Sequence, residues 1–190
     1  NINGEFNFDN YNITIDEDWG RFIGLYMGDG SFYNNTLRVD FDKRDVNSYM
    51  WLESFLNSKF GRCSIINYDF KNQVSIELTS VYLKKLFIDL DLIKKWNGNK
   101  HGYKRKIHVP NYIFKSPKSV IAEYLKGYFD ADSGIYTQQK NIKIYSKELN
   151  KLLSVQYLLT AFDIYTNVKS EIKKTSDHTY NGNSITLRSW

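Results

Sequence analysis

The chain has 190 residues with an apolar fraction of 42%, which is enough for a sizeable core in one domain or two small ones. Its apolar runs are broken by Lys, Asp or Gly well short of about 18 residues, so it holds no transmembrane helix, and its single cysteine, Cys63, excludes an internal disulfide and a cysteine-rich zinc site. The net charge of +5 is uneven, because residues 1–99 hold 11 Lys and Arg against 14 Asp and Glu, whereas residues 100–190 hold 15 against 7.

The basic half predicts a polyanionic partner such as nucleic acid, although a solvated surface with uneven charge has the same composition. The opening residues NINGEFNFDN lack the basic-then-apolar pattern of a secretory signal. Together with the single cysteine, this favours an intracellular, reducing compartment, with cytoplasm, organelle and nucleus all open, and no membrane partner.

The first half predicts a helix, a hairpin, a second helix, a second hairpin and a closing helix. Apolar residues recur at helical spacing in the helical segments and alternate in the hairpins, and a glycine ends the second helix. The segments are residues 22–30 (FIGLYMGDG), 31–43, 46–61, 64–80 and 80–93.

The second half repeats this order after a polar, basic stretch that contains both prolines. Its segments are residues 125–134 (LKGYFDADSG), 133–147, 148–164 and 167–189. In the last of these, Asn181-Gly182 predicts the hairpin turn, and the sequence printed leaves no room for a closing helix.

An internal duplication follows from this order. We expect a first repeat over residues 1–99 with an N-terminal extension over 1–18, a basic linker over 100–118, and a second repeat over 119–190. Asp29 and Asp132 then occupy matching positions, 103 residues apart.

Small residues in the two motif helices predict that these helices pack against each other. Gly24 and Gly28 are four residues apart and share a helix face, and Gly127 and Ala131 repeat that spacing. Glycine costs about 1 kcal/mol against alanine inside a helix, so close approach of a partner helix is a reason for its presence. The ends of the two helices would then meet.

Asp29 and Asp132 stand at those ends, where a carboxylate is disfavoured by the helix dipole and by its neighbour. A divalent cation reverses both effects, since carboxylate and carbonyl oxygens are ligands that Mg²⁺ accepts. We therefore predict a metal site at Asp29 and Asp132, with carbonyls of Gly28 and Ala131, in a phosphodiester-cleaving centre. An Asp-Gly pair after an apolar run is on its own more typical of a helix stop and turn.

Lys43 and Lys147 follow the two acids by 14 and 15 residues, each at the end of the first hairpin. We predict that they bring positive charge to the scissile phosphate or orient the attacking water. A lone lysine in such a place is more often a solvated charge, and the repetition favours the catalytic interpretation.

The paired motifs Phe22–Gly30 and Leu125–Ser133 resemble the signature of the LAGLIDADG homing endonucleases in their single-chain, two-repeat form. The resemblance covers residues 19–190, and the family's metal-binding acid falls on Asp29 and Asp132. It implies an α+β fold of two pseudo-symmetric αββαββ(α) repeats, with paired motif helices at the centre and antiparallel, saddle-shaped sheets on DNA. Ser133 departs from the family pattern in the place of the final glycine.

The resemblance implies a monomeric, intein-borne or intron-encoded endonuclease that uses Mg²⁺, with Mn²⁺ able to substitute. It would make a double-strand break in a long, non-palindromic DNA target with two unlike half-sites. Residues expected on strand faces toward DNA are Arg38, Gln73, Ser75, Gln139, Lys143, Lys169 and Lys173. Residues of the linker expected to follow the DNA backbone are Lys100, Lys104, Arg105 and Lys106.

Two other classes of function stay open at this point. A non-cleaving nucleic-acid binder of the same fold, either an RNA-splicing maturase or a DNA-binding regulator, could carry the same motifs. A glycosidase with paired carboxylates is a further alternative, since aromatic residues could line a sugar site. The three histidines show no metal-ligand spacing.

Overall fold

The computed structural model describes residues 7–8, 13–61, 63–68, 72–95, 103–106, 108–174 and 179–188. Its fold is α+β, as predicted, and the first half follows the predicted order of elements. These elements are α1 (Glu17–Asp29), β3 (Gly30–Tyr33), β4 (Thr36–Asp42), α2 (Val46–Phe60), β5 (Ser64–Tyr68), β6 (Gln73–Thr79) and α3 (Val81–Asp89). Short strands β1 (Asn7–Phe8) and β2 (Ile13–Thr14) pair ahead of them.

The second half repeats the series without a counterpart of α3 among the described residues. Its elements are α4 (Lys118–Asp132), β9 (Ser133–Tyr136), η4 (Thr137–Gln139), β10 (Asn141–Ser146), α5 (Leu149–Thr160), β11 (Val168–Lys174) and β12 (Thr179–Arg188). Between the halves lie β7 (Ile93–Lys95), β8 (Tyr103–Arg105) and η3 (Ile113–Lys115). β8, which lies in the predicted linker, pairs antiparallel with β7, which lies in the predicted first repeat.

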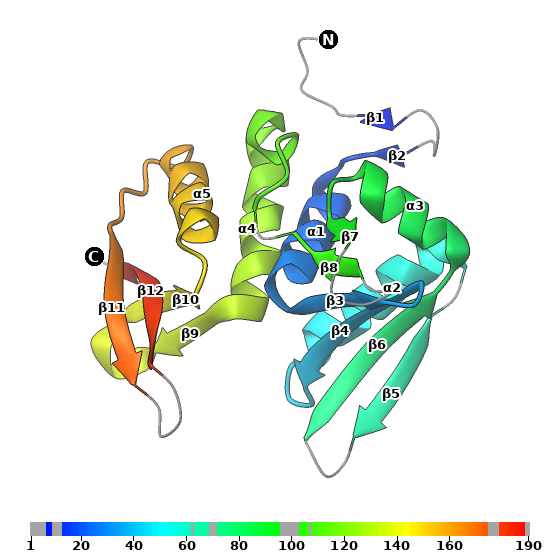
Figure 1. The fold of residues 1–190 in the computed structure, drawn as a ribbon, viewed down its shortest axis with the longest axis horizontal. Helices are drawn as coiled ribbons and strands as arrows, with labels where there is room; N and C mark the ends of the chain where they lie inside the picture. Colours follow the sequence, from blue (N-terminus) through cyan, green and yellow to red (C-terminus); the bar gives the residue numbers. More distant parts are fainter. Residues whose placement is uncertain are drawn as a thin grey trace.

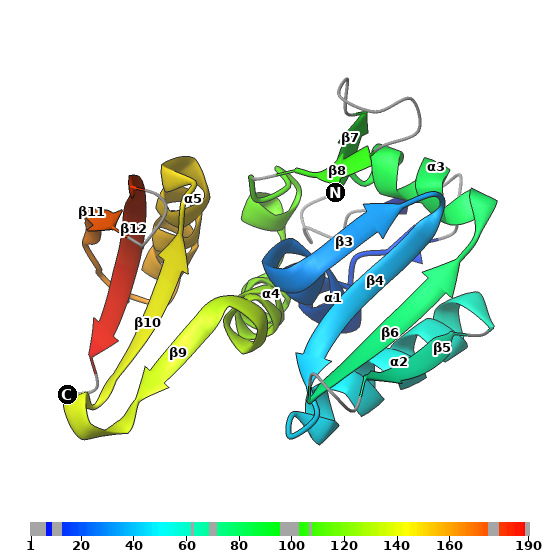
Figure 2. The ribbon, with the colours of Figure 1, turned by 60° about the horizontal axis from the view of Figure 1, so that its bottom comes forward.

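Two antiparallel four-stranded sheets flank the central helices. Their strand orders are β3-β4-β6-β5 and β9-β10-β12-β11, so the two sheets have the same connectivity. Figure 1 shows α1 and α4 side by side, with one sheet spreading to each side. Helix α2 packs on β6 and α5 packs on β12, and Figure 2 shows the strands in front of these two helices.

The α1–α4 interface is as close as the glycine spacing predicts. A Cβ added to Gly24 would overlap the backbone carbonyl of Tyr124, and one added to Gly127 would overlap the backbone carbonyl of Arg21. A Cβ on Gly28 would overlap the methyl group of Ala131. Because the obstructing atoms at the first two positions are backbone, these positions admit no side chain without moving a helix.

The aromatic residues of the first half build its core. The Phe22 and Phe55 rings stack with centroids 5.0 Å apart, Trp19 lies edge-on to Phe55 at 5.3 Å, and Tyr26 lies edge-on to Phe87 at 5.0 Å. Trp19, Phe22, Tyr26 and Phe87 are all almost fully buried. Aromatic residues at these positions stabilise the repeat by burial and ring contacts, and they do not line a sugar-binding surface.

The turn predicted at Asn181-Gly182 is wrong. Asn181 pairs with Ile172 and Gly182 pairs with Glu171, so both lie inside β12. The described pairing runs on to Lys174 and Thr179, so the two strands are joined ahead of Asn181. In the first half, β5 and β6 pair as predicted, and Asn72 takes the positive φ of 50° just before β6.

No helix within the described part of the chain is long and apolar enough to cross a membrane.

Candidate nucleic-acid cleavage site

Asp29 and Asp132 are the last residues of α1 and α4, and they occupy equivalent positions in the two repeats. Each is followed at once by a strand, in which Gly30 pairs with Val39 and Ser133 pairs with Ile144. The contact of Gly28 with Ala131 brings the two helix ends together just before the acids. The convergence predicted from the repeated motif is therefore present.

The pKa of Asp29 is raised to about 6, first by burial of the carboxyl group and then by the nearby charge of Asp132. Arg105 and Lys151 act in the opposite direction and only partly offset these effects. The position at the carboxyl end of a helix is itself unfavourable for an anion. Asp29 is thus a carboxylate that a cation would stabilise.

Lys151 is the cation that contacts Asp132. Its Nζ donates to Asp132 Oδ2 at 2.7 Å and lies 4.7 Å from the centre of the Tyr128 ring, and its side chain is only 8% exposed. Burial lowers the pKa of Lys151, while Asp132 raises it. The sequence interpretation missed this residue. A lysine on the same helix face as Val155 and Leu158 was the signal that could have identified it.

Arg105 holds the end of α1. Its guanidinium donates to the backbone carbonyl of Tyr26 at 3.0 Å and to that of Gly28. The Tyr26 carbonyl also accepts from the backbone N–H of Gly30, so Arg105 adds a second donor there and a first one at Gly28. That Arg105 also follows the DNA backbone stays a prediction. Nothing local in the sequence indicates a contact between residues 77 positions apart.

Lys43 and Lys147 are not equivalent in the sheets. From the pairing of Gly30 with Val39 and of Ser133 with Ile144, Lys147 matches Asp42, and Lys43 matches Glu148. The backbone N–H of Lys43 donates to the Asn72 carbonyl at 3.1 Å, and the Lys147 carbonyl accepts from Asn183 Nδ2 at 3.1 Å. A catalytic role for either lysine stays a prediction.

The carboxylate and carbonyl oxygens at the ends of α1 and α4 fit a magnesium ion whose remaining ligands come from substrate phosphate and water. No three His, Cys, Asp or Glu side chains converge on one point anywhere in the described ranges. Mg²⁺ is commonly held by one or two carboxylates together with substrate phosphate and water, so Asp29 and Asp132 suffice. Of the two predicted carbonyl ligands, Gly28 is already bonded to Arg105, which leaves Ala131 as the better candidate.

A cavity of 440 Å³ opens beside Asp29. It is bordered by Asp40 and Asp42 from β4 and by Asn72 and Gln73 at the start of β6. Gln73, predicted to face DNA, therefore borders the same opening as the acid. The cavity connects Asp29 to the face of the sheet that α2 does not cover.

The outer face of the first sheet carries Arg38 within a network of polar contacts. Arg38 Nε donates to Asp40 Oδ1 at 2.8 Å, and Ser75 Oγ donates to the same carboxylate oxygen. Ser75 is fully buried beneath its neighbours, so the predicted DNA contact by Ser75 is wrong. Its hydroxyl positions Asp40 instead.

The second sheet carries the predicted lysines on its strands. Lys143 in β10 is half-buried, with Nζ 5.0 Å from the centre of the Tyr136 ring, and Lys169 in β11 is exposed. Lys173 pairs with Tyr180 in the same hairpin, and Gln139 lies in η4 between β9 and β10. Their DNA contacts stay predictions.

The other three predicted linker contacts are Lys106, Lys104 and Lys100. The Nζ of Lys106 contacts Asp91 Oδ1, and a contact of this lysine with the DNA backbone stays a prediction. His108 Nε2 lies 2.8 Å from the other oxygen of Asp91. Lys104 pairs with Lys94 across β7 and β8, and Lys100 lies outside the described residues.

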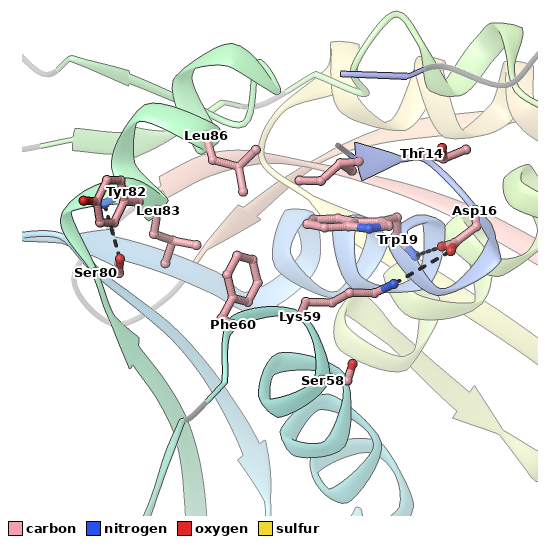
Figure 3. Close-up of a pocket in the computed structure, with 11 residues that line it drawn as sticks. Thr14, Asp16, Trp19, Ser58, Lys59, Phe60, Ser80, Tyr82, Leu83 and Leu86 are labelled. Carbon is pink, nitrogen blue, oxygen red and sulfur yellow. Dashed lines mark hydrogen bonds and ion pairs between the residues drawn. The ribbon is translucent and has the colours of Figure 1, made fainter. Parts of the chain in front are cut away.

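A second cavity, of 480 Å³, lies at the other end of α1. Figure 3 shows Trp19, Leu83 and Leu86 around it, with an ion pair of 4.0 Å between Lys59 and Asp16 at its edge. Ten residues of helix, about 15 Å, separate Trp19 from Asp29. This cavity is therefore separate from the pair of acids.

Comparison with protein families identifies residues 119–188 as a LAGLIDADG-like domain. Among solved structures, the homing endonuclease I-DmoI aligns with a TM-score of 0.59 and 14% identity, over 90% of this chain and 89% of that one. I-DmoI complexes with DNA and Ca and with DNA and Mn align equally well. The N-terminal LAGLIDADG domain of DUF199/WhiA aligns with a TM-score of 0.57 and 13% identity, over 94% of this chain and 81% of that one. These similarities show the fold.

Several curated relatives come from Methanocaldococcus jannaschii. A probable translation initiation factor IF-2 is 28% identical over 161 residues, which is 83% of this chain. The ATP-dependent DNA helicase Hel308 is 26% identical over 164 residues, which is 85% of this chain. The chain spans only 13% of the length of each.

Proposed function

We propose, from its place in the LAGLIDADG family, that this chain is a site-specific DNA endonuclease that makes a double-strand break in a long target with two unlike half-sites. The observation that carries the proposal is the convergence of Asp29 and Asp132 at the paired ends of α1 and α4. A protein that only binds DNA has no need of two carboxylates at unfavourable helix ends. Mg²⁺, or Mn²⁺ in its place, is the proposed cofactor.

Asp29 and Asp132 would hold the metal, which supplies charge neutralisation at the scissile phosphate and a water of lowered pKa. A pKa of about 6 leaves Asp29 ionised at neutral pH, as a ligand must be. The cavity beside Asp29 gives a phosphate access to the acid from the outer face of the first sheet.

Two cations of the chain keep these groups in place. Lys151 orients the Asp132 carboxylate, and Arg105 fixes the last turn of α1. The close α1–α4 interface holds both acids on rigid elements, so the geometry is set before substrate binds.

The relatives also indicate how such a chain is encoded, inside a host protein or inside an intron. A translation factor and a helicase have unrelated activities, yet each shares with this chain a segment that makes up 13% of its length. A segment common to unrelated proteins is best explained as an inserted module. We infer an intein-borne endonuclease, with an intron-encoded origin as the alternative.

The test is selection of cut sites from a randomised duplex library with Mg²⁺. The wild type should cut a defined site, whereas the Asp29→Asn, Asp132→Asn double variant should bind that site and leave it intact. Asp130→Asn is the matched control, because Asp130 lies on the same helix but faces Arg21 at 3.6 Å, and it should still cut. Equal cutting by the double variant would contradict the proposed active site.

A second candidate function is DNA binding without cleavage. It is favoured by the two protein cations that already occupy oxygen atoms at the site, Lys151 on Asp132 and Arg105 on Gly28. The same selection separates the two functions, since specific binding by the wild type with no cut product in Mg²⁺ or Mn²⁺ would establish the second.

A further inference from the structure

We propose that the outer face of the first sheet reads G·C base pairs through Arg38 and its acidic neighbours, while the second sheet supplies the attraction to phosphates. This assignment rests on the proposed DNA-binding function, and it states which base pairs the half-site under the first sheet contains. It follows from a difference in charge between two faces that have the same architecture.

On the first face Arg38 has two acidic neighbours, Asp40 and Glu77, and a third acid, Asp42, follows in β4 and is paired with Arg44. Arg38 pairs with Glu77 across β4 and β6, and Asp40 pairs with Ser75 one step along the same face. Asp40 also borders the cavity of Asp29, so this face is continuous with the cleavage site.

Arg38 is held by several contacts at once. Its Nε lies 2.8 Å from Asp40 Oδ1, and its Nη1 lies 3.5 Å from Glu77 Oε1 and 3.5 Å from the Tyr68 hydroxyl. The Arg38, Asp40 and Glu77 side chains remain 33%, 42% and 25% exposed, so they are oriented and still reachable. Such preorganisation lowers the entropy cost of forming new contacts.

This charge pattern suits base edges better than phosphates. Two acids around one arginine give a face without excess positive charge, which cannot attract a DNA backbone. In the major groove, guanine presents two acceptors that match an arginine, and cytosine presents an amino donor that matches an acidic side chain. An arginine beside a glutamate can therefore satisfy both bases of one G·C pair.

The outer face of the second sheet has the opposite charge pattern, with more cations than acids. Lys143 and Lys169 lie on its strands, and at the register position of Asp40 it carries Tyr145. Glu171 pairs with Gly182 in the hairpin of β11 and β12. Among the described residues of the four strands β9, β10, β11 and β12, it is the only acid. Lysines on an exposed strand attract phosphates whatever the base sequence.

The experiment measures binding, so that its result does not depend on cutting. Sites would be selected from a randomised duplex library in Ca²⁺ with the wild type, Arg38→Lys, Glu77→Gln and, as the matched control on the other sheet, Lys169→Gln. Thermal unfolding of each variant checks that it is folded. Affinity would be measured from low to high salt on the selected site and on copies with the G·C pairs replaced.

We expect the wild type to select at least one G·C pair in the half-site under the first sheet and to lose about 10-fold or more in affinity when it is replaced. Glu77→Gln should abolish that preference and Arg38→Lys should weaken it, because lysine lacks the planar fork of arginine, and neither should lower the salt dependence. Lys169→Gln should keep the preference and reduce the slope of log affinity against log salt by about 1.

A first half-site without G·C preference, or a fall in salt slope with Glu77→Gln or Arg38→Lys, would overturn the assignment. If the wild type selected a site in Ca²⁺ but then failed to cut that site in Mg²⁺ or Mn²⁺, the result would contradict the proposed cleavage and still decide this question. Absence of any selected site would contradict both.

Discussion

The two acids of the site are equivalent in position but differ in their surroundings. Asp29 is raised in pKa by burial and by Asp132, whereas Asp132 has an ion pair with a buried lysine. Substituting each acid by the neutral amide should therefore have opposite effects on stability.

Asp29→Asn should stabilise the protein at pH 8. The folded-state pKa of about 6 exceeds the ordinary value of 3.8, so the folded state binds more protons and its stability falls as pH rises from about 4 to 6. The amide cannot ionise and removes that loss. Thermal unfolding should show a higher Tm for the variant at pH 8 and equal Tm values at pH 4, and a lower Tm at pH 8 would contradict the raised pKa.

Asp132→Asn should destabilise the protein by about 3 kcal/mol at pH 8, because it leaves Lys151 buried without its counter-charge. Adding Lys151→Met removes the uncompensated charge and should recover most of the loss. Denaturant unfolding of both variants measures the two free energies, and additive losses in the double variant would show that the two residues are independent.

Lys151 and Arg105 show what residue-level patterns reveal. Lys151 interrupts an apolar helix face, and this anomaly marks it as a residue with a buried partner. Arg105 sits in a basic run that resembles many DNA-binding stretches, and it reaches the end of α1 only because β8 lies beside both β7 and β3 in the folded chain. The local sequence does not encode this contact between residues 77 positions apart.

At the scale of elements, Gly24→Ala tests the central helix pair. Alanine favours a helix, yet its methyl group would overlap the Tyr124 carbonyl, so we expect a loss of about 1–3 kcal/mol or more. Lys126→Ala, on the exposed side of α4, is the control and should change the free energy of unfolding by less than about 0.5 kcal/mol. A neutral Gly24→Ala would show that the helices separate easily.

The elements themselves were predictable because their periodicities are strong and occur twice. The helix end at Gly61, with φ of 83°, and the hairpins of the first half follow their residue types. The hairpin of β11 and β12 does not, since Asn181-Gly182 is accommodated inside a strand. Register there is set by burial of Ile185 against Ile144, and this long-range contact overrides the turn preference.

At the scale of the whole molecule, divalent cation and stability should be linked. If Mg²⁺ binds between the repeats, it stabilises the folded state and raises the Tm of the wild type at pH 8 in a concentration-dependent way. The Asp29→Asn, Asp132→Asn variant should show no such rise, and Asp130→Asn should show the full rise. An equal rise in all three would place the ion elsewhere.

The sequence predicted the overall arrangement and the position of the acids, but not the contrast between the two sheets. Matching lysines at 43 and 147 suggested symmetric halves, whereas the strand register gives Lys147 the position in the second repeat that Asp42 has in the first. Which residues share a face depends on pairing between strands, and one residue of offset changes the charge of that face.

The fit between α1 and α4 also limits how such a protein can change over generations. A bulkier residue at Gly24 or Gly127 meets main-chain atoms of the opposite helix, so no compensating side-chain replacement can make room for it. Halves from two relatives could therefore be exchanged as cassettes wherever both keep this narrow junction. New targets would then arise by recombination of halves as well as by point mutation.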